Sequence, residues 1–310
     1  MSDGLALAVR GLRKRYGRQV ALDGLEMSVP EGIVYGFLGP NGAGKTTTMR
    51  LLVGLIRPDA GTMELFGRPF HQGDRRRLFE VGALIESPSF YPYLSGRRNL
   101  EALAAVGAPV SRARIEELLE LVALRDRAGD KVSTYSLGMK QRLGIAGALL
   151  SDPRLLLLDE PANGLDPAGI VAMRATLRNL AATGKTVFVS SHILGEVRQM
   201  ADVVGIIAAG RLVREAPMDA LLRDAGRVRV RVARAELDAA RAALAPLGQA
   251  KAEPTFDDGG AWLGVPVGRE RAADVTRALA EAGVFLSGLE TEGNLEALFL
   301  QLTADPEGMR

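Results

Sequence analysis

The segment from Gly39 to Thr46 places three glycines, one lysine and one threonine at the spacing of a phosphate-binding loop. Glycines let backbone N–H groups turn toward phosphate oxygens, and the N-terminus of a following helix adds partial positive charge. Lys45 is expected to reach the β- and γ-phosphates of a nucleotide, and the Thr46 hydroxyl to bind Mg²⁺. The alternative is an incidental glycine-rich turn, which is disfavoured because the chain has only six lysines.

Two adjacent carboxylates follow a run of four leucines, residues 155–158. A buried strand would carry both carboxylates to its tip. Asp159 is predicted to hold the Mg²⁺ shell, and Glu160 to polarise the water that attacks the γ-phosphate. Alone, such a pair is more typical of a solvated turn, but the phosphate-binding loop upstream favours the chemical interpretation.

These motifs need strands that end where the motifs begin. Short apolar runs ending in small or charged residues predict buried parallel strands at 32–39, 155–160 and 185–192. Helical patterns lie between and around them, at 46–55, 112–124, 137–150 and 167–182. The prediction is an α/β domain with helices around a mostly parallel sheet, whose chemistry gathers at the carboxyl ends of the strands.

The charge balance shifts near residue 219. Residues 1–219 carry 28 basic and 23 acidic side chains, whereas 220–310 carry 11 and 14. The second part also has a different rhythm, with strands predicted at 227–232, 261–267 and 284–290 and helices at 236–247, 269–282 and up to residue 302. We therefore predict two domains, 1–219 and 220–310, the second a small α+β domain with the order βαβαβα.

Composition excludes several classes of protein. The 310 residues include 39 Lys and Arg against 37 Asp and Glu, a surplus too small to indicate a nucleic-acid partner. The absence of cysteine excludes disulfides, thiolate metal sites and a Cys nucleophile, and two histidines exclude a histidine-rich metal site. No secretory signal or membrane span is evident, so we expect a soluble chain in a reducing cytosol.

Five ordered motifs together resemble an ABC-type ATPase cassette over roughly residues 5–219. They are 39–46, 135–142, 155–160, 163–166 and 191–192. The resemblance implies the phosphate-loop ATPase fold with a helical subdomain, ATP and Mg²⁺ as ligands, and ATP hydrolysis. The implied nucleotide-binding residues in the loop are Gly39, Pro40, Asn41, Gly42, Ala43, Gly44, Lys45, Thr46 and Thr47.

The resemblance also assigns roles outside the loop. Tyr16 resembles the aromatic residue that stacks on adenine, with a half-buried strand tyrosine as the alternative. Ser136 and Gly138 resemble the signature motif that completes the ATP site of the opposite subunit. Asp166 resembles the aspartate that communicates between the two sites, and His192 the switch that contacts the γ-phosphate. A lone histidine at a strand end is otherwise usually a surface residue.

Two departures from the family pattern stand out. The signature reads Tyr-Ser-Leu-Gly-Met at 135–139, where the commonest form is Leu-Ser-Gly-Gly-Gln. Ser136 and Gly138 remain, so function is expected to survive. Glu86 stands where most cassettes carry a glutamine, and a carboxylate there is expected to alter metal affinity and the timing of hydrolysis near the catalytic water.

The segments 85–100, 135–142 and 295–303 resemble the bacitracin-resistance and lantibiotic-immunity group of bacterial exporters. Within the first segment, Phe90, Tyr91, Tyr93 and Leu94 are candidates for contact with a membrane-spanning partner. The alternative for these four side chains is a local core cluster.

The resulting hypothesis is an ATP-binding and ATP-hydrolysing subunit of an exporter of antibiotics, peptides or amphiphilic, lipid-like compounds. It would act as a cassette dimer, with a homodimer expected, on the cytoplasmic face of the membrane beside integral-membrane permease subunits, without nucleic acid. The alternative is a soluble, non-transport cassette ATPase that acts on ribosomes or DNA. Residues 220–310 would be a regulatory or dimer-stabilising module, or a tail that covers a sheet edge.

Overall fold

The computed structural model describes residues 4–71, 73–74, 77–107, 110–224, 226–248, 254–293 and 295–304. They form two compact units, one ending at Glu215 and one spanning Ala216–Ala304. The boundary was predicted after residue 219, four residues beyond the observed one and inside helix α7 (Met218–Asp224). A shift in charge balance along the sequence cannot locate a boundary more precisely. Each unit is described separately below.

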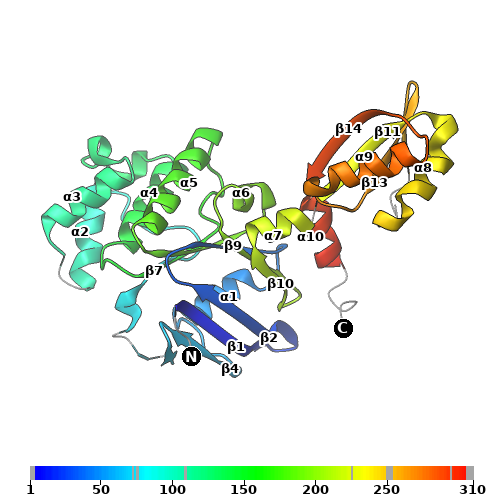
Figure 1. The fold of residues 1–310 in the computed structure, drawn as a ribbon. Helices are drawn as coiled ribbons and strands as arrows, with labels where there is room; N and C mark the ends of the chain where they lie inside the picture. Colours follow the sequence, from blue (N-terminus) through cyan, green and yellow to red (C-terminus); the bar gives the residue numbers. More distant parts are fainter. Residues whose placement is uncertain are drawn as a thin grey trace. The chain divides into compact units, whose positions relative to one another are not determined.

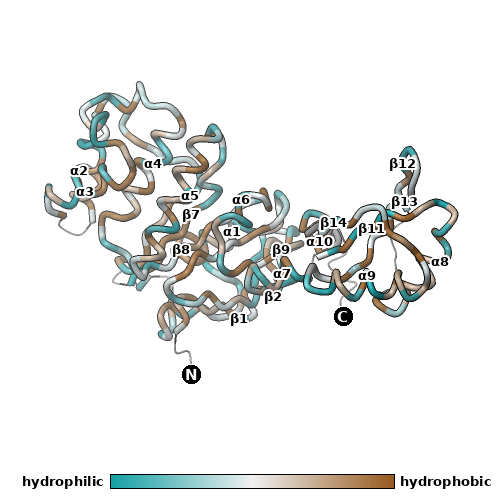
Figure 2. Tube along the Cα trace, turned by 45° about the horizontal axis from the view of Figure 1, so that its top comes forward, coloured by the Kyte–Doolittle hydropathy of each residue, from teal (hydrophilic) through white to brown (hydrophobic). Residues whose placement is uncertain are grey.

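A six-stranded sheet forms the centre of the first unit, with the order β10-β9-β3-β8-β7-β6. Its members are β3 (Val34–Leu38), β6 (Val81–Leu84), β7 (Leu155–Asp159), β8 (Thr186–Ser191), β9 (Val203–Ala208) and β10 (Arg211–Pro217). Strands β6 to β9 and β3 pair in parallel. Every residue of β3, β7 and β8 is buried, as expected for strands covered on both faces, and Figure 2 shows apolar residues along β7 and β8.

Six helices surround this sheet: α1 (Lys45–Leu52), α2 (Gly96–Val106), α3 (Arg112–Leu121), α4 (Leu137–Ala148), α5 (Pro167–Ala182) and α6 (Leu194–Arg198). Figure 1 shows α2, α3 and α4 grouped on the side away from β1, β2 and β4, which is the predicted helical subdomain. Four helices begin at a side chain that accepts a backbone N–H: Ser95, Ser111, Ser136 and Asp166. Such caps fix where each helix starts.

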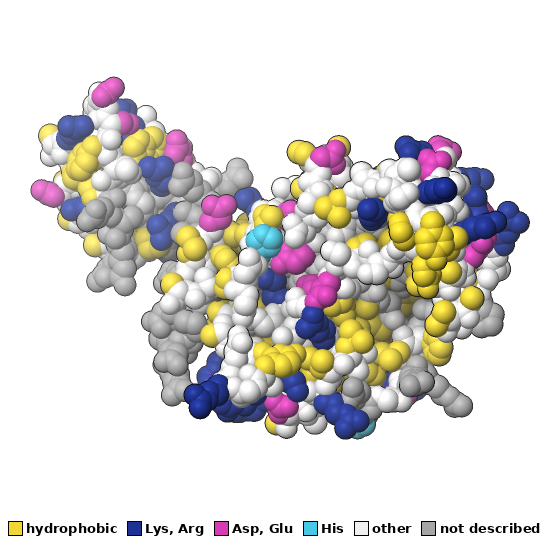
Figure 3. Space-filling view, turned by 180° about the vertical axis from the view of Figure 1, so that it is seen from behind, with side chains coloured by type: hydrophobic (Ala, Val, Ile, Leu, Met, Phe, Trp, Pro, Cys, Tyr) yellow, Lys and Arg dark blue, Asp and Glu magenta, His cyan; other side chains and the backbone are white. Residues whose placement is uncertain are grey.

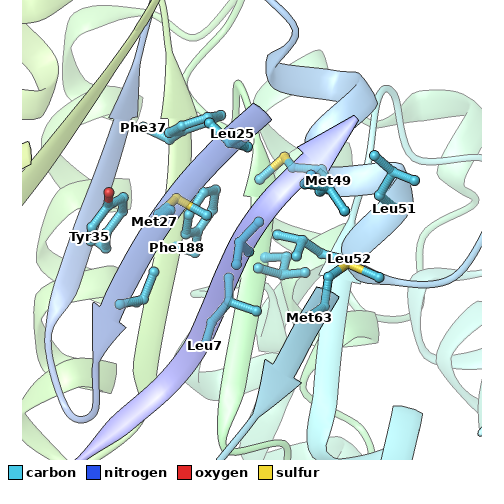
Figure 4. Close-up of a cluster of buried hydrophobic side chains, with 14 of the residues drawn as sticks. Leu7, Leu25, Met27, Tyr35, Phe37, Met49, Leu51, Leu52, Met63 and Phe188 are labelled. Carbon is cyan, nitrogen blue, oxygen red and sulfur yellow. The ribbon is translucent and has the colours of Figure 1, made fainter. Parts of the chain in front are cut away.

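A second, antiparallel sheet completes the first unit and was not predicted. Its order is β2-β1-β4-β5, formed by β1 (Leu5–Tyr16), β2 (Gln19–Pro30), β4 (Ala60–Leu65) and β5 (Arg68–Phe70). Its buried face packs on the central sheet: Leu7, Met27 and Met63 belong to the same core cluster as Phe37 and Phe188, and Figure 4 shows Met27 beside Phe188 and Met63 beside Leu52. This layer carries the β1–β2 turn, and hence Tyr16, to the phosphate-binding loop.

The second unit has its own core and its own sheet. Its elements after α7 are β11 (Gly226–Val232), α8 (Leu237–Leu244), β12 (Thr255–Asp257), β13 (Gly260–Val265), α9 (Ala272–Glu281), β14 (Leu286–Gly293) and α10 (Leu295–Ala304). The antiparallel sheet has the order β12-β13-β11-β14. The order along the chain is therefore βαββαβ with a final helix, a split βαβ arrangement. The predicted order lacked β12, whose three residues are too few to show alternation.

Strand β11 separates the two faces of this sheet. Val228, Val230 and Val232 are buried against the helices, and the intervening arginines lie on the opposite face. There, Arg231 donates two hydrogen bonds to Asp257, at 2.8 and 2.7 Å, and the indole N–H of Trp262 donates a third at 3.0 Å. The arginine holds the pKa of Asp257 at about 2, below its ordinary value.

We predict that Asp257→Asn lowers the unfolding temperature of the second unit at pH 7. The depressed pKa means that ionised Asp257 stabilises the fold at pH values above its ordinary pKa of 3.8, and that this contribution is lost as the pH falls toward about 2. Trp262 is the only tryptophan of the chain, so its fluorescence monitors this unit. The difference between wild type and variant should shrink between about pH 4 and pH 2, and the neighbouring Asp258→Asn should show no such pattern; equal melting temperatures for all three proteins at pH 7 would contradict the prediction.

Candidate nucleotide-binding site

The phosphate-binding loop connects the end of β3 with the start of α1, as predicted. Gly42 and Gly44 have φ of 80° and 109°, in the left-handed region that favours glycine. A Cβ on Gly44 would lie 2.7 Å from the Ala21 carbonyl oxygen, and one on Gly39 would lie 2.5 Å from that of Ile207. The loop therefore needs these glycines both for its turn and for its contact with β2 and β9.

Lys45 is buried, with 5% of its surface exposed. Its Nζ donates to the carbonyl oxygens of Gly39, at 2.7 Å, and Pro40, at 3.3 Å. It also lies 3.3 Å from Glu160 Oε1. A buried ammonium requires such partners, and they hold the cation inside the curve of the loop.

Asp159 connects three elements at the edge of the sheet. It accepts a hydrogen bond from Thr46 Oγ1 at 2.8 Å and one from Ser190 Oγ at 2.5 Å. Only 6% of Asp159 is exposed. Because β7 and β8 are parallel neighbours with Asp159 opposite Ser190, the sheet register brings this pair together. Ser190 was not predicted as a site residue.

Glu160 has an unusual backbone, with φ of 48°. This left-handed conformation is sparsely populated by non-glycine residues and costs about 1–3 kcal/mol. The Glu160 N–H donates to Ser190 Oγ at 2.9 Å, and its Oε2 lies 2.7 Å from His192 Nδ1. The backbone turn therefore directs the carboxylate toward both Lys45 and His192.

The residues behind His192 include a second carboxylate. Glu196, on α6, pairs with Ser191 Oγ at 3.4 Å. Burial raises the pKa of Glu196, as does the negative charge of Glu160, while the Ser191 hydroxyl lowers it. Ser191 Oγ also accepts the backbone N–H of Ile193 at 3.0 Å, so this serine holds the residue that precedes α6.

A cleft of about 540 Å³ opens above the loop. Nine predicted site residues line it: Tyr16, Asn41, Gly42, Gly44, Lys45, Thr46, Thr47, Glu160 and His192. Three further lining residues, Gln19, Ala21 and Asn163, were not predicted. Gln19 pairs with Tyr16 across the β1–β2 turn, and Asn163 belongs to the 163–166 motif, in which only Asp166 was predicted to have a role. Asp159 reaches this site through Thr46.

Ser136, Gly138 and Asp166 do not line this cleft. They line a separate pocket of about 350 Å³ together with Arg142 and Leu165. Ser136 Oγ accepts the Met139 N–H at 3.2 Å and Asp166 Oδ1 accepts the Gly169 N–H at 2.9 Å, so both cap helices. The structure thus groups the predicted signature residues with Asp166, apart from the loop of the same chain.

Glu86 also lies outside the cleft lining. Its carboxylate pairs with Arg50 of α1, and 58% of its side chain is exposed. Its φ of 64° is left-handed.

The four residues predicted to contact a membrane partner differ in exposure. Tyr91 and Tyr93 are 55% and 65% exposed, with ring centroids 5.9 Å apart, whereas Phe90 and Leu94 are partly buried. The two tyrosines therefore form a surface feature and not a core cluster.

Two side-chain oxygens beside the loop are suited to bind a metal ion. Among the described residues, no three His, Asp or Glu side chains cluster as a metal centre. The Thr46 hydroxyl and the Asp159 carboxylate are the oxygen ligands that Mg²⁺ accepts, and Mg²⁺ commonly takes its remaining ligands from water and substrate phosphates. The donor set therefore fits a magnesium ion delivered with a nucleotide.

The fold and this cleft define a phosphate-loop nucleotide-binding ATPase. The family model described as ABC transporter matches residues 22–163. The bacitracin transport ATP-binding protein BcrA of Bacillus licheniformis is 49% identical over 211 residues, covering 68% of this chain and 69% of the relative. The lantibiotic transport ATP-binding protein SrtF of Streptococcus pyogenes is 41% identical over 213 residues, covering 69% and 91%. The chain belongs to the ATP-binding proteins of ABC transporters.

One relative spans both units. The daunorubicin resistance ATP-binding protein DrrA3 of Streptomyces coeruleorubidus is 39% identical over 306 residues, covering 97% of this chain and 96% of the relative. Among solved structures, an ATP-binding subunit of an ABC transporter is 30% identical with a TM-score of 0.63, covering 70% of this chain and 92% of that one. The predicted fold class, exporter ATPase function and enzyme class are thereby confirmed, and these relatives do not support the ribosome or DNA alternative.

We predict that Ser190→Ala lowers both stability and the ATPase rate. The change removes a donor to buried Asp159 and an acceptor for the Glu160 N–H, which should reduce the free energy of unfolding by about 1–3 kcal/mol. Thr186→Val is the matched control, because Thr186 accepts the Gly32 N–H at the other end of the same strand, away from the cleft. Thermal unfolding should show lower stability in both variants, but kcat should fall only in Ser190→Ala. A wild-type kcat in Ser190→Ala would contradict the role of Ser190 in positioning Asp159 and Glu160.

Proposed function

We propose that this chain binds and hydrolyses Mg·ATP as the energy-supplying subunit of an exporter of antibiotics, peptides or amphiphilic, lipid-like compounds. The observation that carries the proposal is the cleft in which Lys45, Thr46 and Glu160 meet. Its support comes from relatives named for bacitracin, lantibiotic and daunorubicin transport or resistance. The class of transported compound is inferred from the names of those relatives and not from a binding site in this chain.

Each residue at the cleft has a separable task in hydrolysis. Lys45 and the N–H groups of residues 41–47 hold the β- and γ-phosphates at the start of α1. Thr46 and Asp159 would hold Mg²⁺, which neutralises phosphate charge when bound. Glu160 accepts a proton from the attacking water, and His192, 2.7 Å from that carboxylate, keeps it oriented and contacts the γ-phosphate.

Two copies are required to complete each ATP site. Ser136, Gly138 and Asp166 lie in a pocket of their own, and each motif occurs once in the chain. We propose that Ser136 and Gly138 of one copy cover the nucleotide held by Lys45 of the other, with Asp166 at the contact between the two sites. A two-fold homodimer satisfies both sites at once.

A separate permease would provide the membrane path. Among the described residues, no helix combines the length and the apolar character that a membrane crossing needs. Exposed Tyr91 and Tyr93 offer an aromatic contact for such a partner, and we place the chain peripherally on the cytoplasmic face. Figure 3 shows basic and acidic side chains intermixed on one face, without the basic stripe that favours a nucleic-acid partner.

For residues 220–310 we propose an accessory domain that regulates or stabilises the cassette dimer. Its sheet and helices α8 and α9 enclose a core of their own, which a tail that only covers a sheet edge would not need. A relative that covers both units over 306 residues supports a role for the whole chain.

Ending the chain after Pro217 tests the accessory role. We expect ATP affinity to stay within about twofold of wild type, because every residue lining the cleft lies in the first unit. ATP-driven dimerisation or the ATPase rate should change at least about threefold, roughly 0.6 kcal/mol. Sedimentation and steady-state kinetics measure these quantities, and an unchanged rate and dimer affinity would favour the covering-tail alternative.

We expect Glu160→Gln to bind Mg·ATP and accumulate as a dimer, because the amide keeps the size of the carboxylate but cannot accept the proton. The hydrolysis rate should fall about 10²- to 10⁴-fold, the usual contribution of a general base. Size-exclusion chromatography with saturating ATP measures the dimer, and Lys45→Ala in the same background should prevent it by removing the phosphate cation. A monomeric Glu160→Gln protein at saturating ATP would count against the dimer proposal.

A further inference from the structure

Tyr16 is the last residue of β1 and lies at the rim of the nucleotide cleft. It pairs with Gln19 across a two-residue turn in which Gly17 has φ of 58°. The residue is 45% exposed. Unless neighbouring groups hold it, a half-exposed aromatic ring at a strand end has rotational freedom that must be lost when a planar ligand stacks on it.

Lys14 lies over this ring. Its Nζ is 5.7 Å from the Tyr16 ring centroid, within the range of a cation–π interaction. The Lys14 side chain is only 15% exposed, and its Nζ donates to Asp59 Oδ1 at 3.0 Å. The ammonium is therefore held between a carboxylate and the ring, and is not a freely moving surface charge.

Asp59 also fixes the backbone of the same strand. Its Oδ2 accepts the Arg15 N–H at 2.6 Å, and its own N–H donates to the Arg13 carbonyl oxygen at 2.9 Å. The hydrogen bonds from Lys14 and from the Arg15 backbone hold the pKa of Asp59 below its ordinary value. The β1–β2 pairing shifts register between Lys14 and Arg15, so these contacts hold the strand where its regular ladder is interrupted.

We propose that Lys14 and Asp59 are positioning residues that hold the Tyr16 ring in the orientation in which it receives the adenine of ATP. This inference rests on the proposed function, in which Tyr16 stacks on adenine. A cation occupies one face of an aromatic ring, so the opposite face remains for the base. The ordering of the ring is then complete before the nucleotide arrives, which improves affinity without adding a contact to it.

The inference predicts an effect that depends on the base of the ligand. Inorganic tripolyphosphate has the phosphates of ATP but no base, so it probes the phosphate-binding loop without Tyr16. A loss of affinity for a nucleotide but not for tripolyphosphate identifies a defect at the base platform. A structural defect that reached the loop would weaken both ligands equally.

Calorimetry on the full-length chain, with the non-hydrolysable analogue adenylyl imidodiphosphate and with tripolyphosphate, tests this directly. Lys14→Met keeps the apolar stem and removes the charge, and should raise the Kd for the nucleotide about three- to tenfold. The Kd for tripolyphosphate should stay within about twofold. Lys14→Arg keeps a cation and should therefore bind the nucleotide with about wild-type affinity. Asp59→Asn should weaken nucleotide binding, as Lys14→Met does. Lys131→Met, at an exposed lysine on the helical subdomain, is the matched control and should bind both ligands like wild type.

Tyr16→Ala separates this inference from the function on which it rests. Nucleotide binding weakened by Tyr16→Ala but not by Lys14→Met would overturn the positioning role and leave the stacking role intact. Unchanged nucleotide binding in Tyr16→Ala would show that Tyr16 does not stack on adenine. It would contradict both the stacking role of Tyr16 and the positioning role of Lys14 and Asp59. Equal loss of nucleotide and tripolyphosphate in Lys14→Met, or failure of Lys14→Arg to restore binding, would reduce Lys14 to a structural residue and also overturn the inference.

Discussion

The buried ammonium of Lys45 sets the condition that the surrounding structure satisfies. A cation with 5% exposure needs fixed oxygen partners, and it finds them in two carbonyls of its own loop and in Glu160. Those partners come from the ends of β3 and β7, which are separated in the sheet by β8. The parallel arrangement of these strands brings their carboxyl ends to one edge, so the position of the charge follows from the topology of the sheet.

The pairing of strands in this sheet also explains which site residues could be predicted from the sequence. The phosphate-binding loop and the Asp159–Glu160 pair are local patterns, and each follows a strand that is visible as an apolar run. Ser190 is different, because its contacts with Asp159 and the Glu160 N–H are made across strands. Nothing in a serine after an apolar run shows which residue will lie opposite it. Tyr16 and His192 were predicted only through the family resemblance.

The fold divides in the same way. Strands β3, β7 and β8 and helices α1 and α5 were predicted because their apolar patterns are strong and long enough to read, whereas α6, a helix of five residues, was not predicted. The antiparallel sheet of β1, β2 and β4 was not predicted, although its buried residues cover the central sheet. In the second unit, β12 was missed because a strand of three residues, Thr255–Asp257, has no readable period. Long-range pairing, and not local preference, decides these elements.

The first unit has two separate pockets that differ in the residues lining them. Lys45, Thr46 and Glu160 contact one cleft, whereas Ser136 and Asp166 begin helices whose N-termini face another. Helix N-termini favour anions, so both pockets suit phosphate groups, but only the first holds a carboxylate beside a buried cation. In the proposed homodimer, the pocket of Ser136 and Asp166 in one copy completes the ATP site at Lys45 of the other. In that proposal, association and hydrolysis are coupled because the two pockets lie apart within each chain.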